Sequence, residues 1–152
     1  MKDDHKKKLS VNKKAYHNYF IEEKFEAGIV LRGTEVKSLR DSKVNLKDSY
    51  ARIQNGEVFI YQMHISPCSF AYYGNHEALR VRKLLLHKHE IKRLYGKVNE
   101  KGFSLIPLSI YFINGKVKVA IAIAKGKHRY DKRESIKKRD AKRDLDRERK
   151  NY

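Results

Sequence analysis

Basic side chains are interleaved with aromatic rings in two parts of this chain. The first group, near the N-terminus, consists of Lys13, Lys14, Tyr16 and Tyr19, and the second, beyond residue 124, consists of Lys125, Lys127, Arg129, Tyr130, Lys132 and Arg133. Lys and Arg contact phosphates while aromatic rings stack on unpaired bases, a combination typical of proteins that bind structured RNA. Packing within a β-prone segment is the favoured interpretation of the two early tyrosines, whereas the late one, flanked by charges, is equally suited to stacking on a partner.

Catalytic and metal-binding patterns are not found in the sequence. The seven histidines form no HExxH spacing, and a single cysteine, Cys68, gives no zinc-finger set and no disulfide. There is no GxSxG, and the KGK at 125–127 lacks the context of a phosphate-binding loop. Carboxylates lie close together at Glu22, Glu23 and Glu26, and a solvated strand edge is the favoured interpretation of Glu22 and Glu23. We therefore expect no catalytic residue, no metal and no cofactor, and an RNA-modifying enzyme or nuclease is the poorer hypothesis.

The charge balance favours a nucleic-acid partner. The 152 residues carry 36 Lys and Arg against 18 Asp and Glu, a net charge of +18, and each cation that meets a polyphosphate releases a counterion. The segment 125–152 alone has 13 basic and 6 acidic residues. Its only aliphatic side chains after Tyr130 are Ile136, Ala141 and Leu145, too few to anchor a helix on a core. No signal peptide or run of 18 apolar residues is seen, so a cytoplasmic location is expected.

Turn and periodicity signals predict a single small β domain between two charged segments. Two pairs of β-prone runs are joined by Asn55-Gly56 and by Asn114-Gly115, the dipeptide best suited to tight hairpins. Short helices are predicted over 35–42, with Thr34 as N-cap, and over 89–98, where residues 91, 94, 95 and 98 form one apolar stripe. Segments 16–25 and 27–31 fit two strands or one bent strand, and 66–81 reads as a long loop with three aromatic residues.

These elements predict a mainly β fold, a small closed or nearly closed antiparallel barrel with two short helices, because closure removes the edges of such a sheet. The predicted organisation is a flexible basic arm over 1–11, an RNA-binding barrel over 12–124 and a basic tail over 125–152. We expect the tail, which has almost nothing to bury, to be disordered alone.

Several motifs in order resemble the small protein B family of SsrA-binding proteins. They are NKKAYHNYFIEEKFEAGIVLRGTEVKSLR, NLKDSYARIQNGEVF, MHISP, RVRKLLLH, LYGKV, PLSIYF and KVAIAIAKGKHRYDKRE, which together cover about residues 12–133. The resemblance implies a small antiparallel oligonucleotide-binding-type β-barrel with two or three short flanking helices. It implies an RNA-binding adaptor of trans-translation that binds the tRNA-like domain of transfer-messenger RNA. It also implies that the tail enters the vacant messenger channel of a stalled ribosome and becomes helical only there.

The resemblance also assigns residues. Those implied to contact RNA are Asn12, Lys13, Tyr19, Glu26 and Leu85, to which the basic pattern adds Lys125 and Lys127. Those implied to lie at the ribosomal decoding centre are Tyr130, Asp131, Lys132 and Arg133. Transfer-messenger RNA and the ribosome are the expected partners, without a membrane, and a monomer is expected. The alternative is a general structured-RNA-binding barrel without a role in ribosome rescue.

Overall fold

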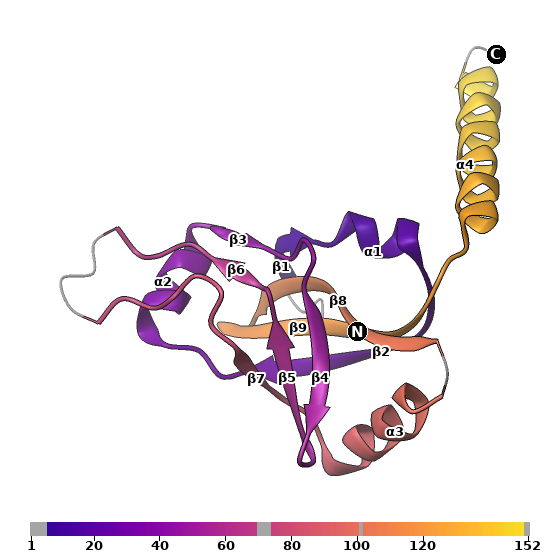
Figure 1. Cartoon of the computed structure of the whole chain (residues 1–152). Coiled ribbons are helices and arrows are strands. Elements are labelled where there is room, and N and C mark those ends of the chain that lie inside the picture. Colours follow the sequence, from indigo (N-terminus) through magenta and orange to yellow (C-terminus); the bar gives the residue numbers. More distant parts are fainter. Residues whose placement is uncertain (1–5, 70–73, 101, 151–152) are drawn as a thin grey trace.

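The computed structural model describes residues 6–69, 74–100 and 102–150 (Figure 1). The strands are β1 Lys6–Val11, β2 Tyr19–Ile29, β3 Val44–Asn45, β4 Tyr50–Gln54, β5 Glu57–Tyr61, β6 His64–Ile65, β7 Arg82–Leu85, β8 Phe103–Ile113 and β9 Lys116–Gly126. The helices are α1 Lys13–Asn18, α2 Gly33–Arg40, α3 Lys88–Val98 and α4 Arg129–Lys150. Among the described residues, no helix has the length and apolar character needed to cross a membrane.

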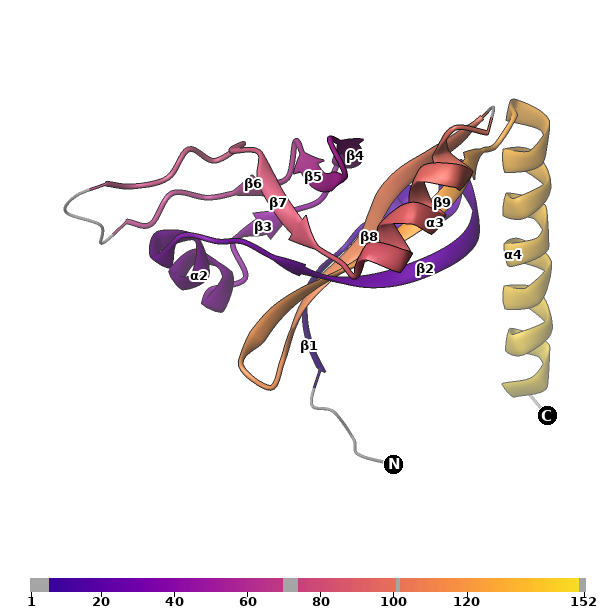
Figure 2. The ribbon, with the colours of Figure 1, turned by 90° about the horizontal axis from the view of Figure 1, so that it is seen from below.

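Six of the strands close into an antiparallel ring in the order β8-β4-β5-β7-β2-β9, with β9 returning to β8. The long, curved β2, β8 and β9 make up one wall and the shorter β4, β5 and β7 the other (Figure 2). The junction of β4 with β8 is the narrowest, with a single register pair, Ala51 and Leu105. The mainly β barrel expected from the sequence is confirmed.

Both predicted hairpins are present with left-handed turn residues. Asn55 and Gly56 have φ of 51° and 75°, and Asn114 and Gly115 have φ of 49° and 76°. These angles suit the two-residue turns that follow the natural twist of paired strands. The turns therefore fix the register at which the β4–β5 and β8–β9 pairings start.

The barrel interior is filled by alternate residues of the strands, as a half-buried sheet requires. Val119, Ile121 and Ile123 of β9 are fully buried on the inner face. The outer face of the same strand is also covered over part of its length, because Ala122 and Ala124 pack with Ala15 of α1. Helix α1 thus seals the outside of the β8–β9 wall.

The N-terminal region differs from the sequence prediction. Residues 6–11, predicted as part of a flexible arm, form β1, which pairs antiparallel with β8. Residues 13–18 form a helix although their aromatic content favoured a strand. Local hydrogen bonding explains the difference, because the side chain of Asn12 caps α1 by accepting from the backbone N–H of Ala15. Residues 19–29 then run as one strand with a register shift between Ile21 and Glu23.

The two short helices lie close to their predicted positions, with differences at their ends. Helix α2 begins at Gly33, before the predicted cap Thr34, and the carboxylate of Glu35 accepts from the backbone N–H of Arg32 at 2.8 Å. In α3 the predicted apolar stripe is only partly buried. Leu94 is fully enclosed, whereas Tyr95 is 58% exposed, because only one face of this short helix meets the barrel.

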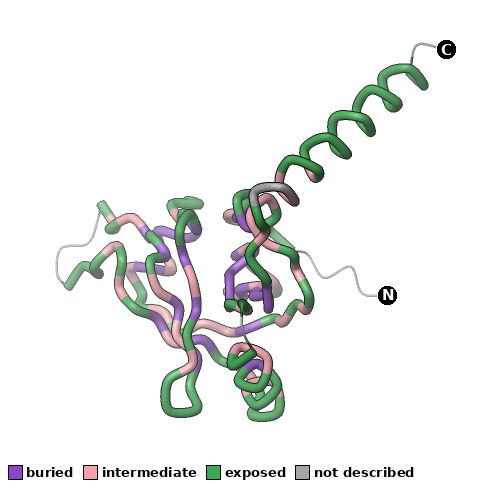
Figure 3. Tube along the Cα trace, turned by 45° about the vertical axis from the view of Figure 1, so that its right-hand side comes forward, coloured by how far each residue is buried: buried purple, intermediate pink, exposed green. Residues whose placement is uncertain are grey.

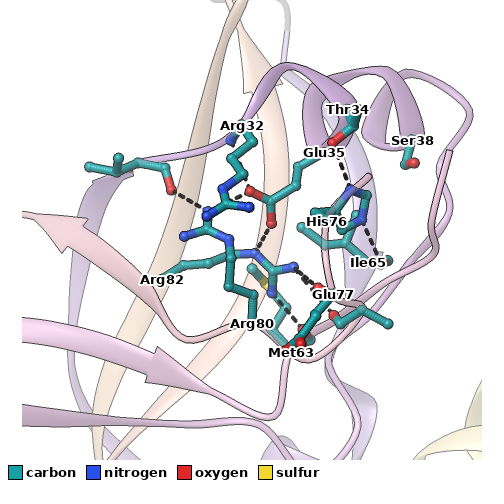
Figure 4. A network of polar contacts seen from close by, with 12 residues as sticks. Arg32, Thr34, Glu35, Ser38, Met63, Ile65, His76, Glu77, Arg80 and Arg82 are labelled. Atoms are coloured by element: carbon teal, nitrogen blue, oxygen red, sulfur yellow. Dashed lines mark hydrogen bonds and ion pairs between the residues drawn. The ribbon is translucent and has the colours of Figure 1, made fainter. Parts of the chain in front are cut away.

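A buried ion cluster ties α2 to β7 (Figure 4). The carboxylate of Glu35 accepts hydrogen bonds from Arg80 and Arg82, and both Glu35 and Arg82 are fully buried. Arg82 also donates to the carbonyl of Met63 at 2.7 Å. Burial opposes ionisation of Glu35, but hydrogen bonds from Arg80, the Arg32 backbone and Arg82 outweigh it and hold the pKa of Glu35 below 4.5. Burial lowers the pKa of Arg82, and the hydrogen bond and negative charge of Glu35 oppose this effect.

The long connection between β6 and β7 is fixed at its base. The side chain of Asn75 accepts from the backbone N–H of Cys68 and donates to its carbonyl. His76 is buried between the hydroxyl of Thr34, at 2.9 Å, and the carbonyl of Ile65, at 3.0 Å. The carbonyl has no proton to give, so Nε2 donates to it and Nδ1 accepts from the hydroxyl. The three predicted loop aromatics, Phe70, Tyr72 and Tyr73, lie outside the described residues.

Helix α4 extends away from the barrel (Figures 1 and 3), and it contacts helix α1. Almost every described side chain from Arg133 onward is exposed, including Ile136 and Leu145. Tertiary packing usually supplies most of the stability of a helix in a protein. Packing against the barrel therefore adds little to the stability of α4. Disorder of the free tail stays a prediction.

Candidate nucleic-acid interface

Glu26 and Leu85 lie on neighbouring strands at the outside of the barrel. Gly28, two residues beyond Glu26 on β2, is in register with Leu85 of β7 and with Lys118 of β9. A Cβ at Gly28 would meet the Cβ of Leu85 at 3.2 Å, so the absence of a side chain there lets Leu85 lie against β2. Leu85 is still 51% exposed. We call Glu26, Gly28, Leu85 and Lys118 the β2–β7 surface.

The carboxylate of Glu26 is held in place by two neighbours. The Tyr111 hydroxyl donates to Oε2 of Glu26 at 2.5 Å, and Lys6 Nζ lies 4.0 Å from the same oxygen and 5.2 Å from the centre of the Tyr111 ring. Burial, together with this hydrogen bond and the negative charge of Glu26, raises the pKa of Tyr111. The hydroxyl therefore stays a donor, and the other carboxylate oxygen is left to accept from a ligand.

The predicted RNA-contacting residues around α1 differ in how far their side chains are exposed to solvent. Asn12 is buried, and its amide is used inside the protein, donating to the carbonyl of Pro107 at 3.0 Å and capping α1. Lys13, the next residue, is exposed at the first position of α1. Tyr19 is half-buried against the cluster beneath α1. The geometry therefore gives Asn12 a structural task, and contact of all three residues with RNA stays a prediction.

Lys125 and Lys127 lie where β9 leaves the barrel. Lys125 is exposed. Lys127 Nζ lies 3.0 Å from the hydroxyl of Ser135 in α4, 3.4 Å from the carbonyl of Tyr16 in α1, and 5.1 Å from the centre of the Phe20 ring. Lys127 therefore links the end of α1 to the start of α4, in addition to any contact with a ligand.

The four predicted decoding-centre residues occupy the first turns of α4. The carboxylate of Asp131 accepts from the backbone N–H of His128 at 3.3 Å, which places a negative charge at the N-terminus of the helix. Lys132 is half-buried and Arg133 is exposed. The side chain of Tyr130 lies outside the described residues. Residues 130–133 thus start the exposed helix that extends from the barrel.

The family resemblance assigned Glu26 and Leu85 to RNA contact, which stays a prediction, but nothing in the sequence indicated the groups that position Glu26. Lys6 was placed in a flexible arm and Tyr111 in the interior of a predicted hairpin, 85 residues from Glu26. No spacing rule links positions so distant in the chain. Arg82, although basic, is wholly buried, because its charge is matched by Glu35. Among the residues that the structure describes, no cluster of His, Cys, Asp or Glu could hold a metal ion.

These features define a class of protein: a small, closed, antiparallel barrel with strongly basic character and a long exposed basic helix. A family model described as "SmpB protein" matches residues 9–151. The chain is 67% identical over 139 residues to an SsrA-binding protein of Syntrophobacter fumaroxidans, covering 91% of this chain and 86% of that one. It is 58% identical to an SsrA-binding protein of Geobacter sulfurreducens, covering 88% of each. The chain therefore belongs to the SmpB protein family.

A solved structure described as "tmRNA-SmpB: a journey to the center of the bacterial ribosome" contains a similar chain. The match has a TM-score of 0.67 and 47% sequence identity and covers 84% of this chain and 93% of that one. At this identity the likeness extends beyond the fold to the family. The resemblance noted in the sequence motifs is thus confirmed.

Proposed function

We propose that this chain is the RNA-binding adaptor of trans-translation. It binds the tRNA-like domain of transfer-messenger RNA, also called SsrA RNA, and delivers it to stalled ribosomes, where its C-terminal tail probes the empty messenger channel. The observation that carries this proposal is the family match over residues 9–151. The relatives are named SsrA-binding proteins, and the similar solved chain comes from a complex with tmRNA and the bacterial ribosome.

The barrel supplies the RNA contacts in this proposal. Glu26 accepts hydrogen bonds from base or ribose donors, because a carboxylate oriented by Tyr111 and partly neutralised by Lys6 keeps free lone pairs. Leu85 offers an apolar contact beside it. Lys13 and Lys125 contact phosphates. Asn12 acts mainly by fixing the start of α1, next to Lys13.

The tail supplies the ribosome contacts. Tyr130, Asp131, Lys132 and Arg133 contact the decoding centre, and the rest of α4 occupies the channel that messenger RNA has vacated. A helix with no buried side of its own gains its stability from the surface that it meets. Helix formation in the channel is then coupled to the absence of messenger RNA.

In this proposal the chain works by binding RNA and the ribosome rather than by catalysis. It does so in the cytoplasm and as a monomer. The charge of the barrel supports RNA binding in general, and the family match supports the particular RNA. The same charge would suit a general structured-RNA-binding barrel, which would bind many RNAs with similar affinity.

Competition at fixed salt distinguishes the two functions. Labelled tRNA-like domain is bound to the full-length chain on filters and challenged with unlabelled tRNA-like domain or with an unrelated structured RNA of equal length. The adaptor should release its RNA to the first competitor at much lower concentration than to the second. Equal displacement by both competitors would contradict the adaptor function and support the general RNA-binding barrel.

A further inference from the structure

A groove of about 770 Å³ lies on the barrel wall where β4 meets β8. Residues of α1 and the C-terminal part of α3 contribute to its lining, and its floor includes Ala51 and Leu105, the single register pair between the two strands. Its volume falls within the roughly 300–1,000 Å³ of typical ligand sites. In the ring order, the β4–β8 junction is opposite the β2–β7 junction. The groove is therefore separate from the β2–β7 surface.

Aromatic rings are available along this groove. Tyr95 of α3, predicted to be buried, is instead 58% exposed and contributes to the lining. Tyr50 of β4, also in the lining, stacks on Tyr61 with ring centres 5.4 Å apart and planes 7° apart. The guanidinium of Arg52 lies 5.2 Å from the Tyr50 ring centre and 6.0 Å from that of Tyr61. A guanidinium held against stacked aromatic rings offers a flat surface on which a base can stack.

Charge and hydrogen-bonding capacity in the groove match an unpaired polynucleotide. Lys14 and Arg52 contribute to the lining, and in the described part of the chain neither forms an ion pair. Among the described residues that line the groove, Asp48 is the only one with a carboxylate. The lining amides of Asn18, Gln54 and Asn99 provide donors and acceptors for the edges of bases. An extended peptide could hydrogen-bond to the strand edges, but it would gain less binding free energy than RNA from the excess of positive charge.

We propose that the groove binds an unpaired segment of RNA, with a base stacked on Tyr95 and phosphates beside Lys14 and Arg52. The proposal rests on the proposed function in taking RNA as the partner, and it adds Tyr50, Arg52 and Tyr95 to the RNA-binding residues. Asn12 and Tyr19 line the α1 side of the groove. These two predicted site residues therefore belong with the groove rather than with the β2–β7 surface.

A fluorescent reporter tests the stacking directly. The chain contains no tryptophan, so Tyr95→Trp places a single indole in the groove. Titration with the tRNA-like domain should quench its emission in parallel with binding, whereas Leu79→Trp, at an exposed position outside the groove lining, should remain unquenched. Quenching of both variants, or of neither, contradicts a base stacked at residue 95. Quenching by a polyanionic peptide as strong as that by RNA would also overturn the proposal.

Affinity measurements with matched variants complete the test. Tyr95→Leu, which removes the ring and keeps similar bulk, should weaken RNA binding about fivefold or more, the low end of measured stacking effects, whereas Tyr95→Phe should bind normally. Arg52→Gln should lower the slope of log K against log salt by about 0.7, while Arg52→Lys should keep it. If all four variants kept normal affinity and a normal salt slope, RNA binding in the groove would be refuted, but the proposed function would not. Failure of the unmodified chain to prefer the tRNA-like domain would instead refute the proposed function.

Discussion

At the scale of single residues, the orientation of the Glu26 carboxylate is the best-defined feature of the candidate interface. Tyr111 is almost completely buried and directs its hydroxyl to one carboxylate oxygen. Lys6 lies near the same oxygen on the solvent side. A carboxylate near a polyanion would be repelled if it were isolated, and the neighbouring ammonium reduces that repulsion. Glu26 can therefore accept hydrogen bonds from RNA in a surface that is otherwise suited to phosphate.

We predict that Glu26→Ala weakens binding to the tRNA-like domain about tenfold or more without unfolding the barrel, because hydrogen bonds to a charged group contribute about 1.5–3 kcal/mol. Tyr111→Phe should weaken binding less, and the two changes together should cost no more than Glu26→Ala alone, since Tyr111 acts through Glu26. Filter binding gives the affinities, and thermal unfolding reports the fold.

Glu22→Ala is the matched control, because Glu22 is an exposed carboxylate on the same strand whose partner is Lys97, at 3.4 Å. It should leave RNA affinity unchanged. Unchanged affinity of Glu26→Ala would refute the role given to Glu26, and additive losses in the double variant would show that Tyr111 acts independently of it.

At the scale of elements, the Glu35 cluster connects α2, the β6–β7 connection and β7. Each of these elements is too short to be stable by itself, and β7 carries Leu85 into the β2–β7 surface. A buried ion pair adds little stability relative to apolar residues, yet loss of one partner leaves an uncompensated charge. The cluster therefore specifies how these elements join more than it adds to their stability.

We predict that Glu35→Gln lowers the free energy of unfolding by about 3–5 kcal/mol at neutral pH, because Arg82 is left buried without its counter-charge. The pKa of Glu35 is lowered on folding. Its contribution to the free energy of unfolding is therefore present above pH 4.5 and is lost as the pH falls below that value. Urea unfolding at a series of pH values should show the gap between the two proteins narrowing below pH 4.5.

Glu57→Gln serves as the control for that series. Glu57 pairs with Lys83 at 2.9 Å, but both side chains are over 40% exposed. An exposed pair contributes less than about 1 kcal/mol, so this variant should stay close to the unmodified protein at every pH. A Glu35→Gln protein with the stability of the Glu57→Gln protein would contradict a structural role for the cluster.

At the scale of the whole molecule, the barrel and the tail divide the charge unequally. Residues 131–152 contain 10 basic and 6 acidic residues, a net of +4, so the rest of the chain keeps +14 of the +18. The predicted RNA contacts up to Lys127 are also in this remaining part. Affinity for RNA should therefore reside mainly in the barrel, and the tail should serve a later step.

We predict that deletion of residues 131–152 leaves affinity for transfer-messenger RNA within a fewfold of the full chain while abolishing rescue of stalled ribosomes. The physical reason is that the deletion removes few net charges but all of the helix that would fill the channel. Filter binding measures the first effect, and tagging of nascent chains on ribosomes stalled in vitro measures the second. A truncated protein that lost most of its RNA affinity would contradict this division of tasks.

Local signals made much of the fold predictable. The Asn-Gly turns, the alternation in β9 and the amphipathic pattern of α3 depend on residues close together in the chain, and these elements formed nearly as predicted. Two of the errors arose where another interaction outweighed the propensity of the segment. Asn12 as an N-cap turned a β-prone segment into α1, and pairing with β8 turned the predicted arm into β1.

The sequence by itself determined the hairpins, the excess of positive charge, the exposed basic tail and, through its motifs, the family. Only the tertiary structure decided that Tyr111 and Lys6 orient Glu26, that Arg82 is buried against Glu35, and that Tyr95 is exposed beside a groove. The reason is that turns and periodicity depend on near neighbours, whereas each of these arrangements depends on how strands and helices pack in the folded chain. Folding brings together residues that are 47 positions apart in the Glu35–Arg82 pair and 85 positions apart in the Glu26–Tyr111 pair.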